Sequence, residues 1–444
     1  MRLRSLWPGR VLLVLIVLSG IAGRPVVAAP PADPWIDAHL DELLKLYRHL
    51  HTHPELSYQE IKTAERIADE LRQIVGMEIT DKVGGTGVVG VLKNGEGPVV
   101  LVRTDMDALP VAEETGLPFA SKEQAKDQQG RTVGVMHACG HDVHMSCFVG
   151  TARWLADHRD RWNGTVLLVA QPAEEAIGGA KAMLDAGLYR RFPKPDYALA
   201  LHCAAEAPAG SVFYCPGPML ASSTSVSITI RGKGGHGAWP HRTVDPILLA
   251  SMFVVDLQSI VSREIEPIQP AVVTVGSIHG GTKHNIIPDE VKLQLTLRTF
   301  SEEVRQQLLA GIRRRAEGLA KAHNAPESTI TIDETTPPTI NSAGLVEKVV
   351  ESLGTSIGAD RVRKAPPVMG AEDFGLFGEG GVPICMFWLG TIEPSRLARA
   401  MESHQPMPAL HSSRYRPDAA PSIATGIRAM TSAVADLLPP KNGS

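Results

Sequence analysis

The sequence predicts an α/β protein: a layered domain with a largely parallel sheet, interrupted by an inserted α+β module. Two observations support this prediction. Apolar runs typical of strands alternate with helical patterns over residues 30–216 and again over 334–444, which is the order of a layered α/β domain. Residues 217–333 follow the order strand, helix, strand, strand, helix, strand, which is typical of a ferredoxin-like module. We therefore expect one layered domain in two pieces, with the module between them.

The first 29 residues differ from the rest of the chain. Arg2, Arg4 and Arg10 flank an apolar run over residues 11–18, and small residues follow at 26–29. This is the layout of a secretory signal peptide that is cleaved near its end. An uncleaved anchor is the alternative, although the apolar run is short for a bilayer span. We expect an exported protein, periplasmic or secreted, that does not associate with the membrane after cleavage.

The overall composition is ordinary for a globular protein, with 43% hydrophobic residues, 21% charged residues and a net charge of -4. The sequence contains no lysine or arginine run of the kind that tracks phosphates, so we expect no nucleic-acid partner. The five cysteines are odd in number and their spacing suggests no disulfide framework. We interpret Cys139 as a ligand and the others as mainly buried residues.

In the first piece of the layered domain, residues 94–97 (NGEG) join two strand patterns and predict a hairpin. His49, His51 and His53 precede the helix-breaking Pro54. We favour a polar loop at these histidines over a set of metal ligands. The expected helices are 34–48, 62–75, 144–157 and 179–186, and the expected strands are 86–93, 98–103, 165–170 and 197–201.

The module is expected to return to the layered domain through residues 336–339 (TPPT), a stiff linker. Loops near 364–383 and 390–409 are rich in proline and glycine, and we expect them to form functional rims. The module's expected strands are 223–231, 271–278, 290–300 and 328–333, and its helices are 243–262 and 301–322. The second piece of the layered domain is expected to contain helices 342–357 and 418–438 and strand 383–389.

Residues 136–144 gather three histidines, a cysteine and an aspartate around Gly140. A glycine allows a tight turn, so Cys139 and His141 can point into one pocket. Thiolate, imidazole and carboxylate groups are good donors for a first-row divalent metal. A reduced core cysteine beside surface histidines is the alternative. More such groups follow strand-like runs or lie near the C-terminus: Asp105, Asp107, Glu174, Glu175, His202 and His411.

Six short blocks of the sequence, in order, resemble the signature blocks of the M20 metallopeptidase family. They are 105–110 (DMDALP), 137–142 (HACGHD), 171–175 (QPAEE), 234–238 (GGHGA), 285–289 (NIIPD) and 370–374 (GAEDF). They are most similar to the amidohydrolase branch, which contains hippurate hydrolases, N-acyl amino acid amidohydrolases and auxin-conjugate hydrolases. The resemblance extends from Arg48 to His411. It implies a metallohydrolase catalytic domain with an inserted lid and dimerisation domain.

The same resemblance implies two divalent metal ions, with Glu174 as the catalytic base. The implied ligands are Cys139, His141, Glu175, His202 and His411. A cysteine ligand favours zinc; manganese is the other main expectation, and cobalt or nickel is feasible. A carboxylate that is not used for coordination can take a proton from water and pass it to the leaving amine. A solvated loop is the alternative for the adjacent Glu174 and Glu175.

Three aspartates are expected to support the ligands. A metal-bound imidazole normally donates its other ring proton to a carboxylate, and Asp107 is our choice for that role. Asp142 is a second candidate for the same role. Asp105 is expected beside the ligands as well, with direct coordination as the alternative.

The resemblance also implies substrate-side residues in the inserted module. His236 would stabilise the oxyanion of the tetrahedral intermediate, reaching across the interface of a homodimer formed through this module. Asn285 and Arg298 would bind the substrate carboxylate, the arginine through its two-pronged guanidinium. A turn residue and a surface ion pair are the alternatives for His236 and Arg298.

We therefore predict a metal-dependent amidohydrolase that cleaves the amide bond of N-acyl amino acids or similar small conjugates. A di- or carboxypeptidase of the same fold is the nearest alternative. A catalytically silent binding protein that kept the fold is a third hypothesis, although every implied ligand and Glu174 are present.

Overall fold

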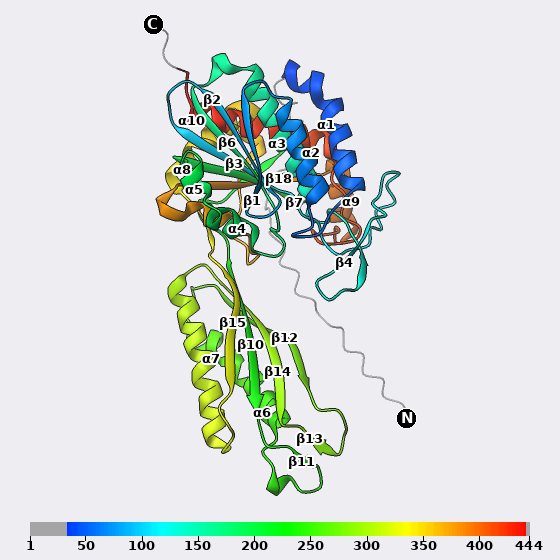
Figure 1. The fold of residues 1–444 in the computed structure, drawn as a ribbon, viewed down its shortest axis with the longest axis vertical. Helices are drawn as coiled ribbons and strands as arrows, with labels where there is room; N and C mark the ends of the chain where they lie inside the picture. Colours follow the sequence, from blue (N-terminus) through cyan, green and yellow to red (C-terminus); the bar gives the residue numbers. More distant parts are fainter. Residues whose placement is uncertain (1–32, 441–444) are drawn as a thin grey trace.

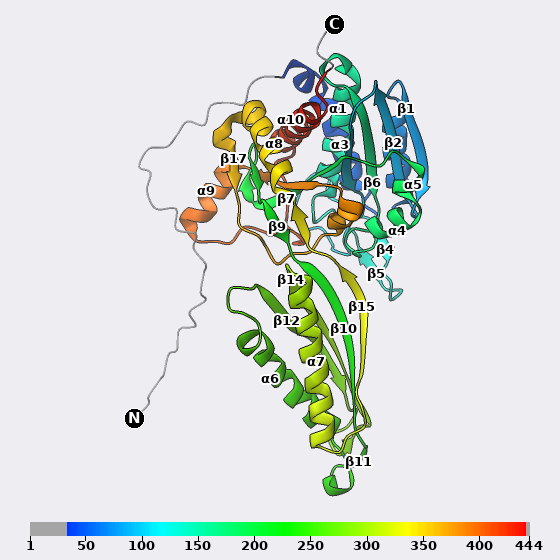
Figure 2. The same ribbon diagram turned by 90° about the vertical axis from the view of Figure 1, so that its left-hand side faces the viewer.

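The computed structural model describes residues 33–440. Its strands form two large sheets, one of eight strands and one of four, in two domains that lie end to end (Figures 1 and 2). The chain leaves the larger domain after β9 (Gly217–Leu220) and re-enters it at β16 (Thr339–Asn341), and these two short strands pair with each other. The predicted signal peptide, residues 1–29, lies outside the described residues.

The larger domain alternates strands and helices, as the sequence predicts. Its first piece contains α1 (Pro34–Thr52), α2 (Ile61–Arg72), β1 (Met77–Val83), β2 (Gly87–Asn94), β3 (Val99–Asp105), β4 (Gln124–Lys126), β5 (Thr132–Gly134), α3 (His141–Asp157), β6 (Gly164–Gln171), α4 (Gly179–Asp185), α5 (Leu188–Arg191), β7 (Tyr197–Pro208) and β8 (Val212–Tyr214). Its second piece contains α8 (Ala343–Leu353), β17 (Val362–Lys364), the short 3-10 segment η5 (Asp373–Gly381), β18 (Ile384–Ile392), α9 (Pro394–Ser403) and α10 (Ala419–Leu437).

The eight-stranded sheet has the order β1-β2-β6-β3-β7-β18-β8-β17. Its four central strands, β6, β3, β7 and β18, are mutually parallel, so their carboxyl ends meet along one edge. The hairpin predicted at 94–97 is wrong, because β6 lies between β2 and β3 and pairs with both. The residues at 94–97 do separate two strands, but local sequence does not choose the partner of a strand.

Both faces of this sheet are covered, which explains the continuous apolar runs of its central strands. In β6, Val166 and Leu168 pack into a core that includes α1, α2, α3, α8 and α10. Leu167 and Val169, which alternate with them, pack against α4, α5 and η5 on the opposite face. The predicted layered α/β fold is confirmed.

The smaller domain contains β10 (Ser222–Arg231), β11 (Gly235–His236), α6 (Pro246–Arg263), β12 (Ala271–Gly280), β13 (Ile286–Ile287), β14 (Glu290–Thr299), α7 (Glu302–Ala322) and β15 (Thr329–Thr336). Its antiparallel sheet has the order β12-β14-β10-β15, which is the ferredoxin-like order. Buried residues alternate along β10 and β14 and pack against α6 and α7 in one separate core. Asp245 and Ser301 cap the two helices by accepting backbone N–H groups.

Several segments differ from the elements predicted by the sequence, which did not indicate β1, β4, β5, β8 or β17. Helix α1 continues to Thr52 and includes His49 and His51, which were expected in a loop, and His53 is its C-cap. Helix α9 lies within the loop predicted over 390–409, and β16 lies at the end of the predicted linker. Among the described helices, α6 alone is long and apolar enough to cross a membrane; one side of it packs in the core of the smaller domain.

Candidate metal and active site

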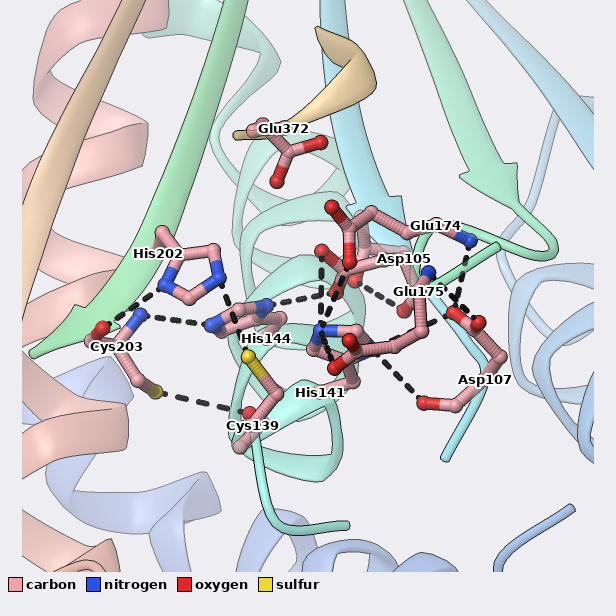
Figure 3. Close-up of polar contacts among 12 residues, drawn as sticks. Asp105, Asp107, Cys139, His141, His144, Glu174, Glu175, His202, Cys203 and Glu372 are labelled. Atoms are coloured by element: carbon pink, nitrogen blue, oxygen red, sulfur yellow. Dashed lines mark hydrogen bonds and ion pairs between the residues drawn. The ribbon is translucent and has the colours of Figure 1, made fainter. Parts of the chain in front are cut away.

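Polar side chains from several segments of the larger domain converge at the carboxyl ends of the parallel strands (Figure 3). Asp105 is the last residue of β3, and residues 172–175 follow directly after β6. His202 lies in the neighbouring β7, and His141 is the first residue of α3. This edge is where open α/β sheets carry their chemistry, because the loops after the strands are free to hold polar groups.

Gly140 makes the turn that brings Cys139 and His141 into one pocket. Its φ of +84° lies in the left-handed region, where a side chain is strained. A Cβ at this position would lie 2.9 Å from Sγ of Cys203, so the pocket wall leaves no room for one. The local conformation expected from this glycine is therefore present.

The five predicted metal ligands come together. Sγ of Cys139 lies 3.5 Å from Nε2 of His202 and 3.3 Å from Nε2 of His411. Oε1 of Glu175 lies 3.5 Å from Nε2 of His411 and 3.9 Å from Nε2 of His141. These residues are far apart in the sequence, so the cluster forms only when both pieces of the larger domain are folded.

The cluster fits two cations side by side. Cys139 belongs to two groups of potential ligands, one with His141 and His202 and one with Glu175 and His411; within each group the ligand atoms lie within 4.8 Å of one another. Nε2 of His141 and Oε1 of Glu175 are buried and have no hydrogen-bond partner. Buried polar atoms are rarely left unsatisfied, so these two indicate a missing partner. Sulfur, nitrogen and oxygen donors together suit a divalent first-row metal.

Burial controls the protonation of these groups. It raises the pKa of the Cys139 thiol well above the usual value, and the carboxylates of Glu175 and Glu174 raise it further. It lowers the pKa of His202 well below the usual value, which keeps the imidazole neutral and able to bind a cation. It raises the pKa of Glu175 to about 7, with Asp107 adding to the effect and His141 opposing it. The cluster therefore carries less negative charge than its composition suggests until a cation is bound.

Glu174 lies beside the cluster with its own surroundings. Its Oε2 is 3.8 Å from Nε2 of His141, and it forms another acidic group with Glu372 and Asp373. Burial, followed by the charge of Glu372, raises the pKa of Glu174 well above the usual value for a carboxyl group. A raised pKa suits a group that must accept and then release a proton near neutral pH.

Asp107 orients the ligands through both its backbone and its side chain. The ring Nδ1 of His141 lies 2.8 Å from the backbone carbonyl oxygen of Asp107, and the Asp107 carboxylate is 3.5 Å away. That carboxylate accepts the N–H groups of Glu174 and Glu175 and the hydroxyl of Ser57. Asp107 thus holds both glutamates at their backbone, and it orients His141 mainly through its carbonyl oxygen.

Asp105 is linked to the cluster through His144, one turn after His141 on α3. Oδ1 of Asp105 lies 2.7 Å from Nδ1 of His144, whose Nε2 accepts the N–H of Cys203 at 2.8 Å. Nδ1 of His202 lies 2.8 Å from the carbonyl oxygen of Cys203, so Nε2 of His202 is left facing Cys139. Asp105 therefore supports His202 through a chain of hydrogen bonds (Figure 3).

Arg103 lies beneath the site and joins three segments. It is fully buried and donates to Oδ2 of Asp105 at 2.6 Å, to Glu372 at 2.8 Å and to Gln171 at 2.9 Å. Asp373 in turn accepts the amide of Gln171 and the backbone N–H of Ala180, on either side of the loop that carries Glu174. The guanidinium thereby offsets the charge of neighbouring carboxylates and connects this loop to the second piece of the domain.

Asp142 does not orient any of the predicted ligands. Its carboxylate lies 2.6 Å from Nδ1 of His51 in α1, and Nε2 of His51 lies 3.1 Å from Glu113. Burial lowers the pKa of His51, but the two carboxylates outweigh it and raise the pKa to about 10. The protonated His51 therefore joins α1, α3 and the loop that carries Glu113 in a structural ion triad.

The three predicted substrate residues of the inserted module lie in two places. His236 in β11 and Asn285 beside β13 are exposed at the tip far from the larger domain, where the Asn285 carbonyl accepts the N–H of Gly237 (Figures 1 and 2). Arg298 lies near the end of β14, and its partner in β10 is Ser223 at the base of the module. Burial lowers the pKa of Arg298, and no carboxylate lies within ion-pairing distance of it among the described residues.

Sequence reasoning missed His144, Arg103 and Glu372. Two of them carry a local signal: His144 is three residues after His141 on one helix face, and Arg103 is two residues before Asp105 on one strand face. Glu372 lies in a recognised block, but its contact with Arg103 spans 269 residues.

Comparisons with known proteins identify the family of this chain. Residues 101–434 match peptidase family M20/M25/M40. Hippurate hydrolase of Campylobacter jejuni is 39% identical over 343 residues, which cover 76% of this chain and 85% of that enzyme. Thermostable carboxypeptidase 1 of Saccharolobus solfataricus is 37% identical over 355 residues, which cover 79% of this chain and 86% of that enzyme.

The fold is similar to a solved structure of the same family. A dinuclear metal-binding M20 peptidase of Bacillus subtilis is 31% identical and has a TM-score of 0.72, and the match covers 90% of this chain and 98% of that protein. The resemblance seen in the six sequence blocks is thus confirmed, and the chain belongs to peptidase family M20/M25/M40.

Proposed function

We propose that this protein is a metal-dependent amidohydrolase that cleaves the amide bond of N-acyl amino acids or similar small conjugates. The observation that carries the proposal is the placement of Glu174. It is a buried carboxyl group beside a ligand cluster that fits two cations, and it lies outside the two groups of potential ligands that share Cys139. The similarity to a hippurate hydrolase supports an N-acyl amino acid as the substrate.

Two divalent cations bound by the cluster would polarise the amide carbonyl and lower the pKa of an attacking water. Glu174 would take one proton from that water while the water oxygen bonds to the carbonyl carbon. Glu174 would then deliver this proton to the amide nitrogen as the C–N bond breaks. The products are a carboxylic acid and a free amino acid. Asp107 holds the backbone of Glu174 in place through both steps.

A substrate panel with metal analysis on the same sample tests this function. The purified protein is assayed on N-acyl amino acids and on dipeptides, before chelation, after chelation and after metal is restored. We expect kcat/KM to favour N-acyl amino acids and activity to follow metal content. A preference for dipeptides would instead support the di- or carboxypeptidase alternative. The similarity to a carboxypeptidase is the observation that favours this alternative. No hydrolysis of either class by the metal-loaded protein would support a silent binding protein.

For the metal, we propose two ions per chain, with zinc or manganese as the main expectation. The Cys139 thiolate favours zinc, whereas the carboxylate and imidazole donors also accept manganese, cobalt or nickel. Mass spectrometric metal analysis of protein reconstituted with each ion gives the stoichiometry and the preferred metal. One ion per chain at saturation would contradict the shared role of Cys139.

We also propose a homodimer formed through the inserted module, in which His236 and Asn285 reach the active site of the partner. The solvent side of α6 exposes apolar residues, with Val255 73% and Leu248 53% exposed. Strand β12 beside it is an unpaired sheet edge. Exposed apolar surface beside a free strand edge is typical of an interface, and a second copy of the same surface can cover both.

Mixing two inactive variants tests the action of His236 in trans. Glu174→Gln retains His236, and His236→Ala retains Glu174, so a mixed dimer has one complete site only if His236 acts across the interface. We expect activity to appear after the variants are mixed and allowed to exchange subunits. A variant with Leu248→Glu and Val255→Glu in addition to His236→Ala should give no recovery. Recovery of activity in a mixture that contains only monomers would contradict the proposal. So would the absence of activity from dimers that have exchanged subunits.

Residues 1–29 support a final proposal, export by cleavage of a signal peptide. The test is fractionation of the producing cells with sequencing of the mature N-terminus. A start near residue 30 in the exported fraction is expected, and full-length protein retained in membranes would indicate an anchor instead.

A further inference from the structure

A cavity of about 470 Å³ opens directly beside the ligand cluster. Glu175, Ala176 and Ile177 form its wall on the catalytic side, and Leu109 follows the loop that carries Asp107. The opposite wall is the β4–β5 hairpin, through Val133 and the turn that follows β4. The volume lies within the range of sites that bind small molecules. Because Glu175 lines this cavity, a group bound in it is next to the reacting bond.

The hairpin is a fixed wall of this cavity. Ala125 and Val133 pack against a small apolar cluster of Leu56, Ala108 and Val135 beside the catalytic loops. The turn is closed by hydrogen bonds: Oδ1 of Asp127 accepts the N–H groups of Gln129 at 2.9 Å and Arg131 at 2.8 Å. The amide of Gln59 donates to the carbonyl oxygen of Lys126 at 3.0 Å, which ties β4 to the segment after α1.

The charges around the cavity disfavour a carboxylate. Arg131 is the one cationic side chain among the described residues that line it, and its Nε lies 2.7 Å from Oδ2 of Asp127. Glu334 of β15 also faces the cavity and has no ion-pair partner in the described part of the chain. A substrate carboxylate in this cavity would meet a neutralised arginine and an unpaired glutamate. The half-buried Arg298 at the base of the module has no such competitor.

We infer that this cavity binds the acyl group of the substrate, and that Val133 in the β4–β5 hairpin sets the size of acyl group that fits. The inference rests on the proposed amidohydrolase function. An N-acyl amino acid carries its free carboxylate on the amino-acid side, so the uncharged acyl side is the part that suits a cavity without a free cation. Leu109, Val133 and Ile177 give this otherwise mixed lining its apolar surface. The cavity has room for an aromatic or medium-length acyl group.

Substitutions at two adjacent positions of β5 test the inference. Val133→Trp fills the cavity, whereas Thr132→Trp adds the same bulk on the opposite face of the strand, since neighbouring side chains alternate. Metal-loaded enzymes are assayed on N-acetylglycine, N-benzoylglycine and N-benzoylleucine. For Val133→Trp we expect kcat/KM for N-benzoylglycine to fall about tenfold or more relative to N-acetylglycine, within the range that pocket size supplies. Thr132→Trp should leave that ratio unchanged.

A smaller side chain gives the reverse test if the larger one prevents folding. Val133→Ala should shift the ratio toward N-benzoylglycine and leave the preference between glycine and leucine unchanged. An equal change in both tryptophan variants, no change in either Val133 variant, or a change confined to the glycine–leucine pair would overturn the inference. Wild-type protein that hydrolyses none of the three substrates would instead contradict the proposed function itself, which separates the two failures.

Discussion

The ligand cluster of the larger domain and the tip of the inserted module both present histidines, but in opposite surroundings. In the cluster, His141 and His144 are buried, and their ring nitrogens face groups on β3, on the loop after it and on β7. At the tip, His236 is exposed, its Nδ1 accepts the N–H of Ala238 two residues away, and its ring packs beside Trp239. The first site is assembled by the fold of one chain, whereas the second is held only by its own loop.

This difference predicts which changes affect stability and which affect rate alone. A buried charge must be compensated by its neighbours, so the removal of one partner leaves another uncompensated. An exposed histidine with local contacts leaves nothing unsatisfied when it is removed. Changes in the cluster should therefore alter folding or metal binding, and changes at the tip should alter turnover without altering the protein's stability.

The largest effect is expected for Glu174→Gln, which separates rate from metal binding because Glu174 lies beside the predicted ligands and is not one of them. The amide cannot accept a proton, so kcat should fall by at least about 10²–10⁴-fold while metal content is unchanged. Glu175→Gln is the matched neighbouring variant, and it should lower metal occupancy as well as rate. Added metal should restore part of the activity of Glu175→Gln and none of that of Glu174→Gln. Metal stoichiometry and kcat over a metal titration measure both. Loss of metal from Glu174→Gln alone would mean that the two roles are reversed.

Arg103→Met tests whether compensation of buried charge holds the site together. The change leaves Asp105, Glu372 and Asp373 without their shared cation, so we expect the free energy of unfolding to fall by about 3–5 kcal/mol, the usual result of breaking a buried ion pair. Arg72→Met is the control, because Arg72 pairs with two exposed aspartates and such pairs contribute about 0–1 kcal/mol. Urea denaturation of both variants gives the comparison. Equal losses would show that burial does not distinguish the two arginines.

His236→Ala should reduce kcat by about 10²–10³-fold, the usual effect of removing an oxyanion donor. The free energy of unfolding should stay within about 0.5 kcal/mol of wild type, as for other surface substitutions. His241→Ala, also exposed on the same tip, should change neither quantity. Steady-state kinetics and denaturation on the same preparations measure both. A stability loss comparable to that of Arg103→Met would remove the contrast between the two regions.

A pH-dependent effect on stability is expected from the ion triad of His51. Its pKa in the folded protein is raised to about 10 from an ordinary value of 6.5, so its stabilisation is complete below about pH 6.5 and is lost as pH rises through about 10. His51→Gln should therefore be less stable than wild type at pH 6, and the difference should shrink by pH 10. His49→Gln, on the exposed side of the same helix, should show no such trend. Denaturation at pH 6, 8 and 10 measures the difference in the free energy of unfolding between each variant and wild type. A difference for His51→Gln that grows with pH would contradict the ion triad.

The sequence by itself determined the fold class, the order of the main strands and helices, and the family. These features depend on residues that are close in the sequence. Apolar periodicity distinguishes strands from helices, and both Gly140 and the glutamates after β6 lie in motifs of a few residues. The tertiary structure decided the partners. Strand β6 lies between β2 and β3, Asp142 pairs with His51 and not with a ligand, and Arg103 meets Glu372 across 269 residues. Pairing of this kind depends on which distant parts of the chain pack against each other. A buried strand edge or a buried charge pairs with a group that packing places beside it, and local sequence does not encode that group.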